Sequence, residues 1–317
     1  MAERSGLISS ERKYVRVLSL QSLRTLMLTA LMVTMVWLTS SVPDALGREI
    51  EEIQREGTLR HLGIPYAAFV TDDARGLDVE LMRNFAAYLG VRYEFVETDW
   101  QNLVADLTGK LVKPRGDDVE VMAESPVRGD VIATGFTVLE WRKRVVDFSS
   151  PTFPTGVWVV SRADSPLQPI TATGDIDEDI KAVKRELKGK SVLGLKGSCL
   201  DPDLYGLSET GALVKMFPSD RNLEEMIPAI IARAADSTLM DVPVALVALE
   251  KWPGEIKTIG PVSRPQEMAC AFARTSPKLG QAFERFFQKM KADGTYKSLV
   301  MKYYPSVFTY YPDFLKN

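Results

Sequence analysis

The strongest constraint on the fold is an alternation of short β-rich runs with helix-like segments, which extends from residue 48 to the end of the chain. Residues 58–64, 91–96, 131–134 and 157–161 are predicted strands, because each run is short and rich in apolar side chains. Segments between them carry apolar side chains at the spacing of an amphipathic helix. Alternation of this kind is typical of an α/β protein with mostly parallel strands.

Two helices are predicted together with their ends. In residues 78–89 the apolar side chains share one face, with Asp78 as the expected N-cap and Gly90 as the expected end. A Ser-Pro pair at residues 276–277 begins the other helix, and Gly294 closes it. Apolar side chains recur on one face of this second helix, at Leu279, Phe283, Phe286, Phe287 and Met290. That spacing predicts packing in a core.

Two polar stretches interrupt the alternation. Residues 112–129 contain two prolines and two glycines, and residues 164–179 end in the acidic run DIDED. Both are predicted to be solvated surface loops, with a partner-binding role as the alternative. Pro228 lies inside a segment of helical periodicity and predicts a kink or a restart of that helix.

The N-terminus carries the pattern of an export signal. Residues 1–24 hold five Lys and Arg against two Glu, and the apolar residues 25–38 follow. Small residues stand at the −3 and −1 positions of a predicted cut before Arg48. The alternatives are an uncleaved anchor, since residues 23–42 are long enough to cross a bilayer, and a buried helix of the fold. We therefore expect residues 1–47 to be a signal peptide or an anchor, and the protein to be exported to the periplasm.

The composition excludes several classes of function. A length of 317 residues favours two packed lobes. The 39 Lys and Arg are balanced by 42 Asp and Glu, with no long basic run, which argues against a nucleic-acid partner. One histidine, with only Cys199 and Cys270 as cysteines, argues against a Cys/His zinc site and a Ser-His-Asp centre. These two cysteines can form at most one disulfide.

Five segments in chain order carry a family resemblance: GLDVELMRNFAAYLG at 76–90, TGFTVLEWRKRVVDFSSPTF at 134–153, LKGKSVLGLKGSC at 187–199, MDVP at 240–243 and FFQKMKADGTYKSLVMKYY at 286–304. They resemble the corresponding segments of the family 3 bacterial solute-binding proteins. Members of that family are the periplasmic receptors of polar amino-acid ABC importers. The resemblance covers about residues 49–304.

The resemblance implies the architecture of the type II periplasmic binding proteins, in which two α/β lobes are joined by two crossing strands. Lobe 1 would comprise residues 48–155 and 267–317, and lobe 2 residues 156–266. The crossings would lie near residues 152–156 and 265–269. The ligand would bind in the cleft between the lobes, in keeping with the tendency of ligand sites to lie at domain interfaces.

The resemblance also implies a carboxylate clamp. Arg142 would hold the carboxylate of an amino acid, with the Thr137 hydroxyl and the Gly135 backbone as helpers. The chemistry agrees, because a guanidinium binds a carboxylate through two parallel hydrogen bonds. The alternative is that Arg142 is solvated like Lys143 and Arg144 beside it.

For the ammonium of the ligand, the resemblance points to Asp241, whose competing and compatible role is a helix N-cap. In the second lobe, the turn at residues 197–199 would close on the ligand carboxylate through backbone N–H groups, including those of Ser198 and Cys199. Cys199 stands where the family usually has Thr or Ser, and a thiol is a weak donor. The contact usual in the family is therefore in doubt at Cys199.

Tyr66 and Trp100 match aromatic positions that would form the walls of the pocket, although each is equally well explained as a core aromatic. The implied mechanism is capture by closure, in which ligand contacts from both lobes favour the closed form. An ABC-type membrane permease would recognise that form. The resemblance implies a monomer and requires neither a metal nor an organic cofactor, and the ligand's identity stays open.

Two other functions remain open. The segment at 76–90 and the C-terminal residues also resemble the regulatory half of membrane-bound lytic transglycosylase F. That enzyme carries a lysozyme-like domain after this one, whereas the chain stops at Asn317, so a non-catalytic domain that senses cell-wall fragments or solutes is the alternative. Some members of the family are cyclohexadienyl dehydratases. The single histidine, His61, and the lack of an acid/base pair argue against that activity.

Overall fold

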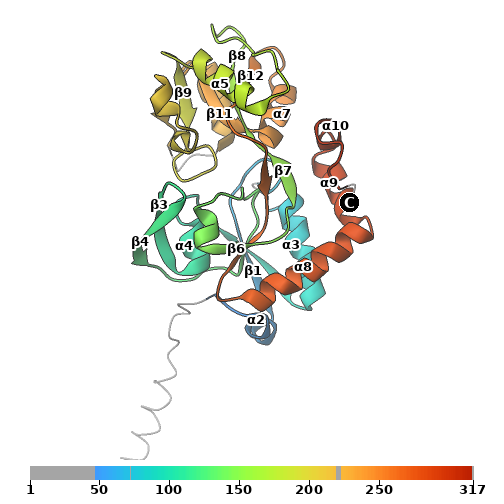
Figure 1. The fold of residues 1–317 in the computed structure, drawn as a ribbon. Helices are drawn as coiled ribbons and strands as arrows, with labels where there is room; N and C mark the ends of the chain where they lie inside the picture. The colour runs from blue at the N-terminus through green and yellow to red at the C-terminus, as the bar shows by residue number, and fades with distance from the viewer. Residues whose placement is uncertain (1–46, 72, 219–222, 316–317) are drawn as a thin grey trace, which may run out of the picture. The chain divides into compact units, whose positions relative to one another are not determined.

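Two five-stranded sheets, each accompanied by helices, form two lobes (Figure 1). The computed structural model describes residues 47–71, 73–218 and 223–315. We call the part around the sheet that contains residues 58–63 lobe 1, and the part around the sheet that contains residues 157–162 lobe 2. The predicted fold class, two α/β lobes joined by crossing strands, is confirmed.

The sheet of lobe 1 takes strands from both halves of the chain: β1 (Thr58–Gly63), β2 (Arg92–Glu97), β5 (Val131–Ile132), β6 (Val146–Phe148) and β14 (Ala271–Ala273). Their order is β2-β1-β5-β14-β6. Strand β1 is parallel to β2 and β5, but β14 is antiparallel to β5 and β6. Strand β6 therefore runs in the same direction as β1, β2 and β5, and the prediction of mostly parallel strands is confirmed for this sheet. The exception is β14, which the chain enters on its return from lobe 2.

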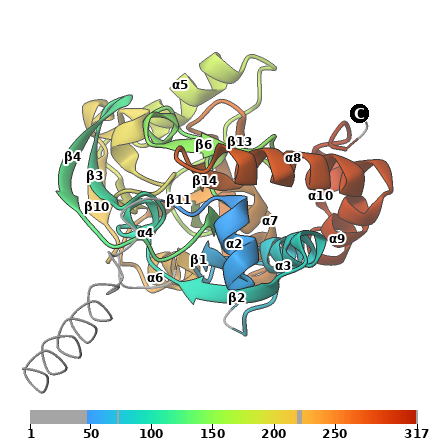
Figure 2. The same cartoon turned by 90° about the horizontal axis from the view of Figure 1, so that it is seen from below.

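In the described residues, lobe 1 also contains α2 (Ile50–Glu56), α3 (Leu77–Leu89), α4 (Leu103–Thr108), α8 (Pro277–Ala292), α9 (Thr295–Tyr303) and α10 (Val307–Tyr310). Figure 2 shows α3, α8 and α9 side by side. Their aromatic rings interlock, with centroids 5.2 Å apart for Phe85 and Phe283 and 4.8 Å apart for Phe287 and Tyr296. The predicted core role of the apolar face of α8 is confirmed.

The sheet of lobe 2 consists of β8 (Val157–Arg162), β9 (Ser191–Gly194), β10 (Leu213–Met216), β11 (Ser237–Asp241) and β12 (Ile256–Pro261), in the order β10-β9-β11-β8-β12. Helices α5 (Ile176–Glu186), α6 (Met226–Ile231) and α7 (Val242–Lys251) belong to this lobe. In the antiparallel pairing of β11 with β8, Asp241 lies opposite Val157. The end of β11 therefore lies at the end of the lobe where the chain enters β8.

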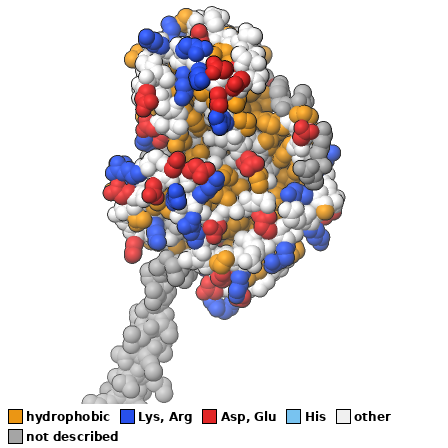
Figure 3. Space-filling model, in the orientation of Figure 1, with side chains coloured by type: hydrophobic (Ala, Val, Ile, Leu, Met, Phe, Trp, Pro, Cys, Tyr) orange, Lys and Arg blue, Asp and Glu red, His pale blue; other side chains and the backbone are white. Residues whose placement is uncertain are grey.

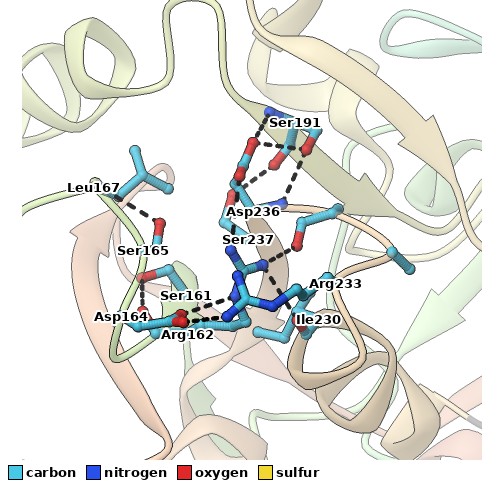
Figure 4. Close-up of polar contacts among 12 residues, drawn as sticks. Ser161, Arg162, Asp164, Ser165, Leu167, Ser191, Ile230, Arg233, Asp236 and Ser237 are labelled. Carbon is cyan, nitrogen blue, oxygen red and sulfur yellow. Dashed lines mark hydrogen bonds and ion pairs between the residues drawn. The ribbon is translucent and has the colours of Figure 1, made fainter.

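Polar contacts fix the opposite end of this sheet (Figure 4). At the end of β8, Arg162 donates from Nη1 to the carbonyl oxygen of Ala235 over 2.6 Å and from Nε to Asp164 over 3.0 Å. Beside it, the Asp236 carboxylate accepts from the amide and the hydroxyl of Ser191, each over 2.8 Å. These bonds join β8, β9 and β11 at the end of the sheet opposite Asp241. They therefore help to fix the strand register that positions Asp241.

Two short strands connect the lobes. Strands β7 (Phe153–Thr155) and β13 (Gln266–Met268) pair antiparallel, and they fall within the two segments predicted to cross between lobes. We call this pair the hinge. The boundaries predicted for the two lobes remain a prediction.

Both predicted surface loops contain regular structure. Residues 112–129 lie largely in a β-hairpin of β3 (Lys110–Arg115) and β4 (Asp118–Glu124), whose turn has Gly116 in the left-handed region at φ 63°. The loop prediction was wrong here because it followed the polar composition and missed an alternation of apolar and charged side chains. Val112 lies opposite Val121 on one face of the hairpin, and Lys113 lies opposite Glu120 on the other. In the second stretch, Asp175 caps α5 by accepting from the amides of Asp177 and Glu178. The acidic run is thus the first turn of a helix, where acidic side chains stabilise the helix dipole.

The predicted helix ends are confirmed in part. Gly90 ends α3 in the left-handed conformation, and Pro277 opens α8, as predicted. The N-cap of α3 is Gly76 rather than Asp78, whose carboxylate lies inside the first turn and bonds elsewhere. Pro228 lies in the short helix α6, which restarts after a 3₁₀ turn.

The predicted signal peptide or anchor lies almost wholly outside the described residues, so its cleavage remains a prediction. In the described part of the chain, no helix is both long enough and apolar enough to cross a bilayer.

Arg48 is buried in lobe 1 among ion pairs. Its Nε donates to Asp130 Oδ1 over 2.8 Å, and its Nη2 donates to the carbonyl oxygen of Thr58 over 3.1 Å. A further ion pair joins Arg48 to Glu56. These contacts attach residue 48 to β1 and to the residue that precedes β5.

Replacing Arg48 with methionine is expected to lower the free energy of unfolding by about 3 kcal/mol, because Asp130 then keeps a buried charge without its main partner. Urea unfolding followed by circular dichroism measures this loss. Arg115→Met is the matched control, since its ion pair with Glu120 is exposed on the hairpin and contributes less than about 1 kcal/mol. Equal losses in the two variants would contradict the assigned role of Arg48.

Candidate functional site

Residues from both lobes meet in a buried polar cluster. From lobe 1, the Tyr66 hydroxyl donates to Oδ2 of Asp241 in lobe 2. Also from lobe 1, Arg142 donates from Nη2 to the carbonyl oxygen of Gly197 in lobe 2, over 3.4 Å. Five of the predicted site residues lie in or beside this cluster: Tyr66, Thr137, Arg142, Cys199 and Asp241.

Arg142 begins a 3₁₀ turn (Arg142–Arg144), and its side chain is 1% exposed. The guanidinium carbon lies 4.0 Å from the centre of the Phe136 ring, and Nη1 donates to the carbonyl oxygen of Thr137 over 2.8 Å. Its Nε has no hydrogen-bond partner among the described residues. Lys143 and Arg144 are exposed, so the alternative that Arg142 is solvated like them is wrong. Burial lowers the pKa of Arg142 to about 10, which still leaves it charged at neutral pH.

Asp241 is the last residue of β11 and is fully buried. It occupies the N-cap position of α7, but its side chain forms no capping hydrogen bond. Oδ2 accepts from Tyr66, whereas Oδ1 has no partner within the described ranges. Burial raises the pKa of Asp241 to about 7, against the lowering effect of the Tyr66 hydroxyl. The carboxylate therefore lacks the compensation that a buried charge requires.

Tyr66 is buried against Asp241, and Trp100 is buried against Tyr66. The two rings are perpendicular with centroids 5.6 Å apart, and Tyr66 also stacks on Phe69 with centroids 6.1 Å apart. Tyr66 lies in the turn after β1, where its backbone bridges to Val70. These contacts fix the direction of the Tyr66 ring, so its hydroxyl is aimed at lobe 2.

The turn predicted to close on a carboxylate is largely satisfied by its own residues. The Ser198 hydroxyl donates to the carbonyl oxygen of Leu195 over 2.9 Å and accepts from the amide of Leu200 over 3.0 Å. The amide of Gly197 donates to Asp201 over 3.2 Å. The Cys199 thiol lies beside the Thr137 hydroxyl without a well-formed hydrogen bond, and burial raises its pKa to about 12. Cys199 and Cys270 are both free and buried.

The backbone of Gly135 is also engaged. Its amide donates to Asp78 Oδ2 over 2.6 Å. Gly135 has φ 59°, and a Cβ there would lie 2.7 Å from the Phe69 ring, so only glycine fits. The Gly135 amide therefore holds the start of α3, and the predicted role of the Gly135 backbone beside a ligand remains a prediction.

Asp78 predicts a pH dependence of stability. Burial raises its pKa to about 7, above the ordinary value of about 4. The folded state thus binds the extra proton between these pH values, and stability falls as pH rises from 4 to 7. Asn resembles the neutral carboxyl group, so Asp78→Asn is expected to match the wild type near pH 4 and to exceed it at pH 8 by up to about 4 kcal/mol. Urea unfolding at both pH values tests this, and parallel curves would contradict it.

Several neighbours of the cluster were not predicted. Phe136 and Trp141 flank Arg142. The sequence could have indicated this contact, because an arginine near aromatic residues in one segment often packs on their rings. Tyr205 donates to the carbonyl oxygen of Cys199, and Gln266 on the hinge has an Oε1 atom with no partner among the residues described. No local pattern in the sequence marked Tyr205 or Gln266.

A hollow of about 580 Å³ lies next to the cluster and is lined by both lobes and the hinge. Lobe 1 contributes Leu139 and Trp141, lobe 2 contributes Leu204 and Tyr205, and the hinge contributes Gln266. Figure 3 shows hydrophobic side chains gathered across the middle of the face it displays. Trp141 and Tyr205 border both the hollow and the cluster. Within the described ranges, no group of three His, Cys, Asp or Glu side chains is placed to hold a metal ion.

Comparison with known proteins finds one matching family and relatives of two kinds. Residues 123–306 match the family described as bacterial extracellular solute-binding proteins, family 3. The chain is 26% identical to a membrane-bound lytic murein transglycosylase F of Desulfosudis oleivorans, over 74% of this chain and 45% of that protein. It is 24% identical to the arginine-binding extracellular protein ArtP of Bacillus subtilis, over 74% of this chain and 79% of that protein.

Solved structures agree with these matches. The crystal structure of a mutant ArgBP from T. maritima superposes with a TM-score of 0.64 at 25% sequence identity, covering 81% of this chain and 99% of that one. The chain spans less than half the length of the transglycosylase, and most of the length of ArtP.

Proposed function

The chain belongs to the bacterial extracellular solute-binding proteins, family 3, and on that premise we propose that it captures a small zwitterionic solute, an amino acid, between its lobes. One observation carries the proposal: a buried arginine and a buried aspartate lie in one cluster, each with a polar atom that has no partner in the described structure. These atoms are Nε of Arg142 and Oδ1 of Asp241.

The charges of the cluster complement those of a free amino acid. A carboxylate bound by Arg142 would give the guanidinium its missing partner, and an ammonium bound by Asp241 would compensate the buried carboxylate. Thr137 and Cys199 lie near the carboxylate end, while Tyr66 contacts Asp241 and Trp100 packs against Tyr66. Binding without chemical change is the role that fits this arrangement. The ArtP relative is named for binding arginine, which supports an amino acid as the ligand class.

Delivery completes the proposed function. The hinge allows the lobes to open and close, and ligand contacts from both lobes would favour the closed form. We propose that a monomer in the periplasm presents this closed form to an ABC-type permease. The apolar, basic-flanked N-terminal sequence supports export.

A thermal-shift screen of the full chain against the amino acids tests the proposed function. A ligand at 100 times its Kd adds about 2.7 kcal/mol of stability, which raises the Tm of a protein of this size by roughly 4 °C. We expect one amino acid, or a small group of related ones, to give such a shift at millimolar concentration. No shift with any amino acid would contradict the proposal.

The match to lytic transglycosylase F favours a second candidate function, a non-catalytic domain that senses cell-wall fragments. The same screen separates the two functions if muropeptide fragments are included. A shift with muropeptides and none with amino acids would support the second function.

A further inference from the structure

One hydrogen bond in the cluster connects the two lobes directly. Tyr66 follows β1 in lobe 1, and Asp241 ends β11 in lobe 2, 175 residues further along the chain. The Tyr66 hydroxyl donates to Oδ2 of Asp241, and both side chains are buried. The contact therefore joins the lobes without exposure to water.

The hydroxyl holds one oxygen of the carboxylate that the proposed function assigns to a ligand, and the other oxygen, Oδ1, is buried while this bond joins the lobes. An ammonium donates hydrogen bonds to a carboxylate in the same way as a hydroxyl group, so the two donors compete for Asp241. At the other end of the cluster, Nη2 of Arg142 donates to the carbonyl oxygen of Gly197 over 3.4 Å, which is a second bond between the lobes. Both ends of the proposed site are thus engaged by the protein's own groups.

We propose that Tyr66 is an internal competitor of the ligand: its hydroxyl holds the lobes together through Asp241, and a solute's ammonium must displace it in order to bind. This inference rests on the proposed function of the site. It also restricts the ligand class to solutes with an ammonium group. A solute that carries only a carboxylate would leave the Tyr66–Asp241 bond in place.

The ring and the hydroxyl of Tyr66 have separable roles. The ring packs against Trp100 and Phe69, and a phenylalanine at this position keeps those contacts. If the hydroxyl contacted the ligand favourably, its removal would weaken binding. If it competes with the ligand, its removal strengthens binding, because a larger fraction of the protein is then competent to bind.

Isothermal titration calorimetry of the full chain, with the amino acid that gives the largest thermal shift, tests the competition. We expect Tyr66→Phe to bind at least about tenfold more tightly than the wild type, the effect of losing a hydrogen bond to a charged group. Unchanged or weaker binding would overturn the proposal. Tyr296→Phe is the matched control, because Tyr296 is equally buried and donates to the carbonyl oxygen of Thr152 over 2.7 Å, on the lobe 1 side of the hinge.

Small-angle X-ray scattering in the absence of added solute tests the connection between the lobes without depending on any ligand. We expect a larger radius of gyration for Tyr66→Phe than for the wild type, and no change for Tyr296→Phe. An unchanged radius for Tyr66→Phe would overturn the proposal. Failure of both the wild type and Tyr66→Phe to bind any amino acid would count against the proposed function, and the scattering result would then decide the role of Tyr66.

Discussion

Replacing Arg142 with alanine is expected to weaken binding of the amino acid by roughly 10²–10⁴-fold, since loss of one partner of a buried charge pair costs about 3–5 kcal/mol. The guanidinium is fully buried, held by the Thr137 carbonyl oxygen and the Phe136 ring, so it is pre-positioned to bind a carboxylate. Isothermal titration calorimetry with the amino acid identified by the thermal-shift screen measures the loss.

Two further variants serve as controls for the loss of affinity in Arg142→Ala. Lys143→Ala removes the neighbouring exposed cation, which pairs with Glu140, and is expected to bind like the wild type. Arg142→Lys keeps the charge but loses the planar pair of donors, so we expect an intermediate affinity. An unchanged affinity in Arg142→Ala, measured on protein that unfolds cooperatively, would refute the carboxylate clamp.

Replacing Asp241 with asparagine is expected to abolish measurable binding, and the affinity of the wild type is expected to depend on pH. An ammonium binds the ionised carboxylate, and burial raises the pKa of Asp241 to about 7. Lowering the pH from 8 to 6 protonates the carboxyl group of the free protein, so the affinity of the wild type should fall by about tenfold. Amino acids keep their zwitterionic form over this range, so the change reports on the protein.

Calorimetry in two buffers of different ionisation enthalpy provides an independent measurement. Near pH 7 the wild type should release a proton when it binds, and the observed enthalpy should therefore differ between the buffers. An affinity that stays constant from pH 6 to pH 8, with no proton released, would show that Asp241 does not meet an ammonium.

Local features of the fold could be predicted from the sequence. The end of α3 at Gly90 and the start of α8 at Pro277 depend on single residues with restricted backbone conformations, which the sequence displays directly. The hairpin of β3 and β4 was not predicted, because its charged residues favoured a loop. Its side chains do alternate, with Val112 opposite Val121 on the apolar face. The antiparallel entry of β14 depends on the path of the chain through lobe 2, which no local pattern records.

The candidate site, too, could be predicted only in part. The residue types of Arg142 and Asp241, taken with the family resemblance, predicted two opposite charges for a zwitterion, and the structure places both in one cluster. The bonds that engage the other positions were not predictable, since they join residues far apart in the chain. Asp78 takes the amide of Gly135, and Tyr66 bonds to Asp241 across 175 positions.

The hinge has a consequence for how the cleft would respond to solute. Because the chain enters and leaves lobe 2 through the paired strands β7 and β13, the two lobes stay tethered when they separate. The Tyr66 hydroxyl therefore meets Asp241 at an effective concentration that the tether sets, of millimolar order or higher for a short connection, whatever the amount of protein present. A solute competes at its own, variable concentration. Capture therefore begins at a solute concentration that is fixed by the protein itself. The strength of the hydrogen bond between Tyr66 and Asp241 sets that concentration.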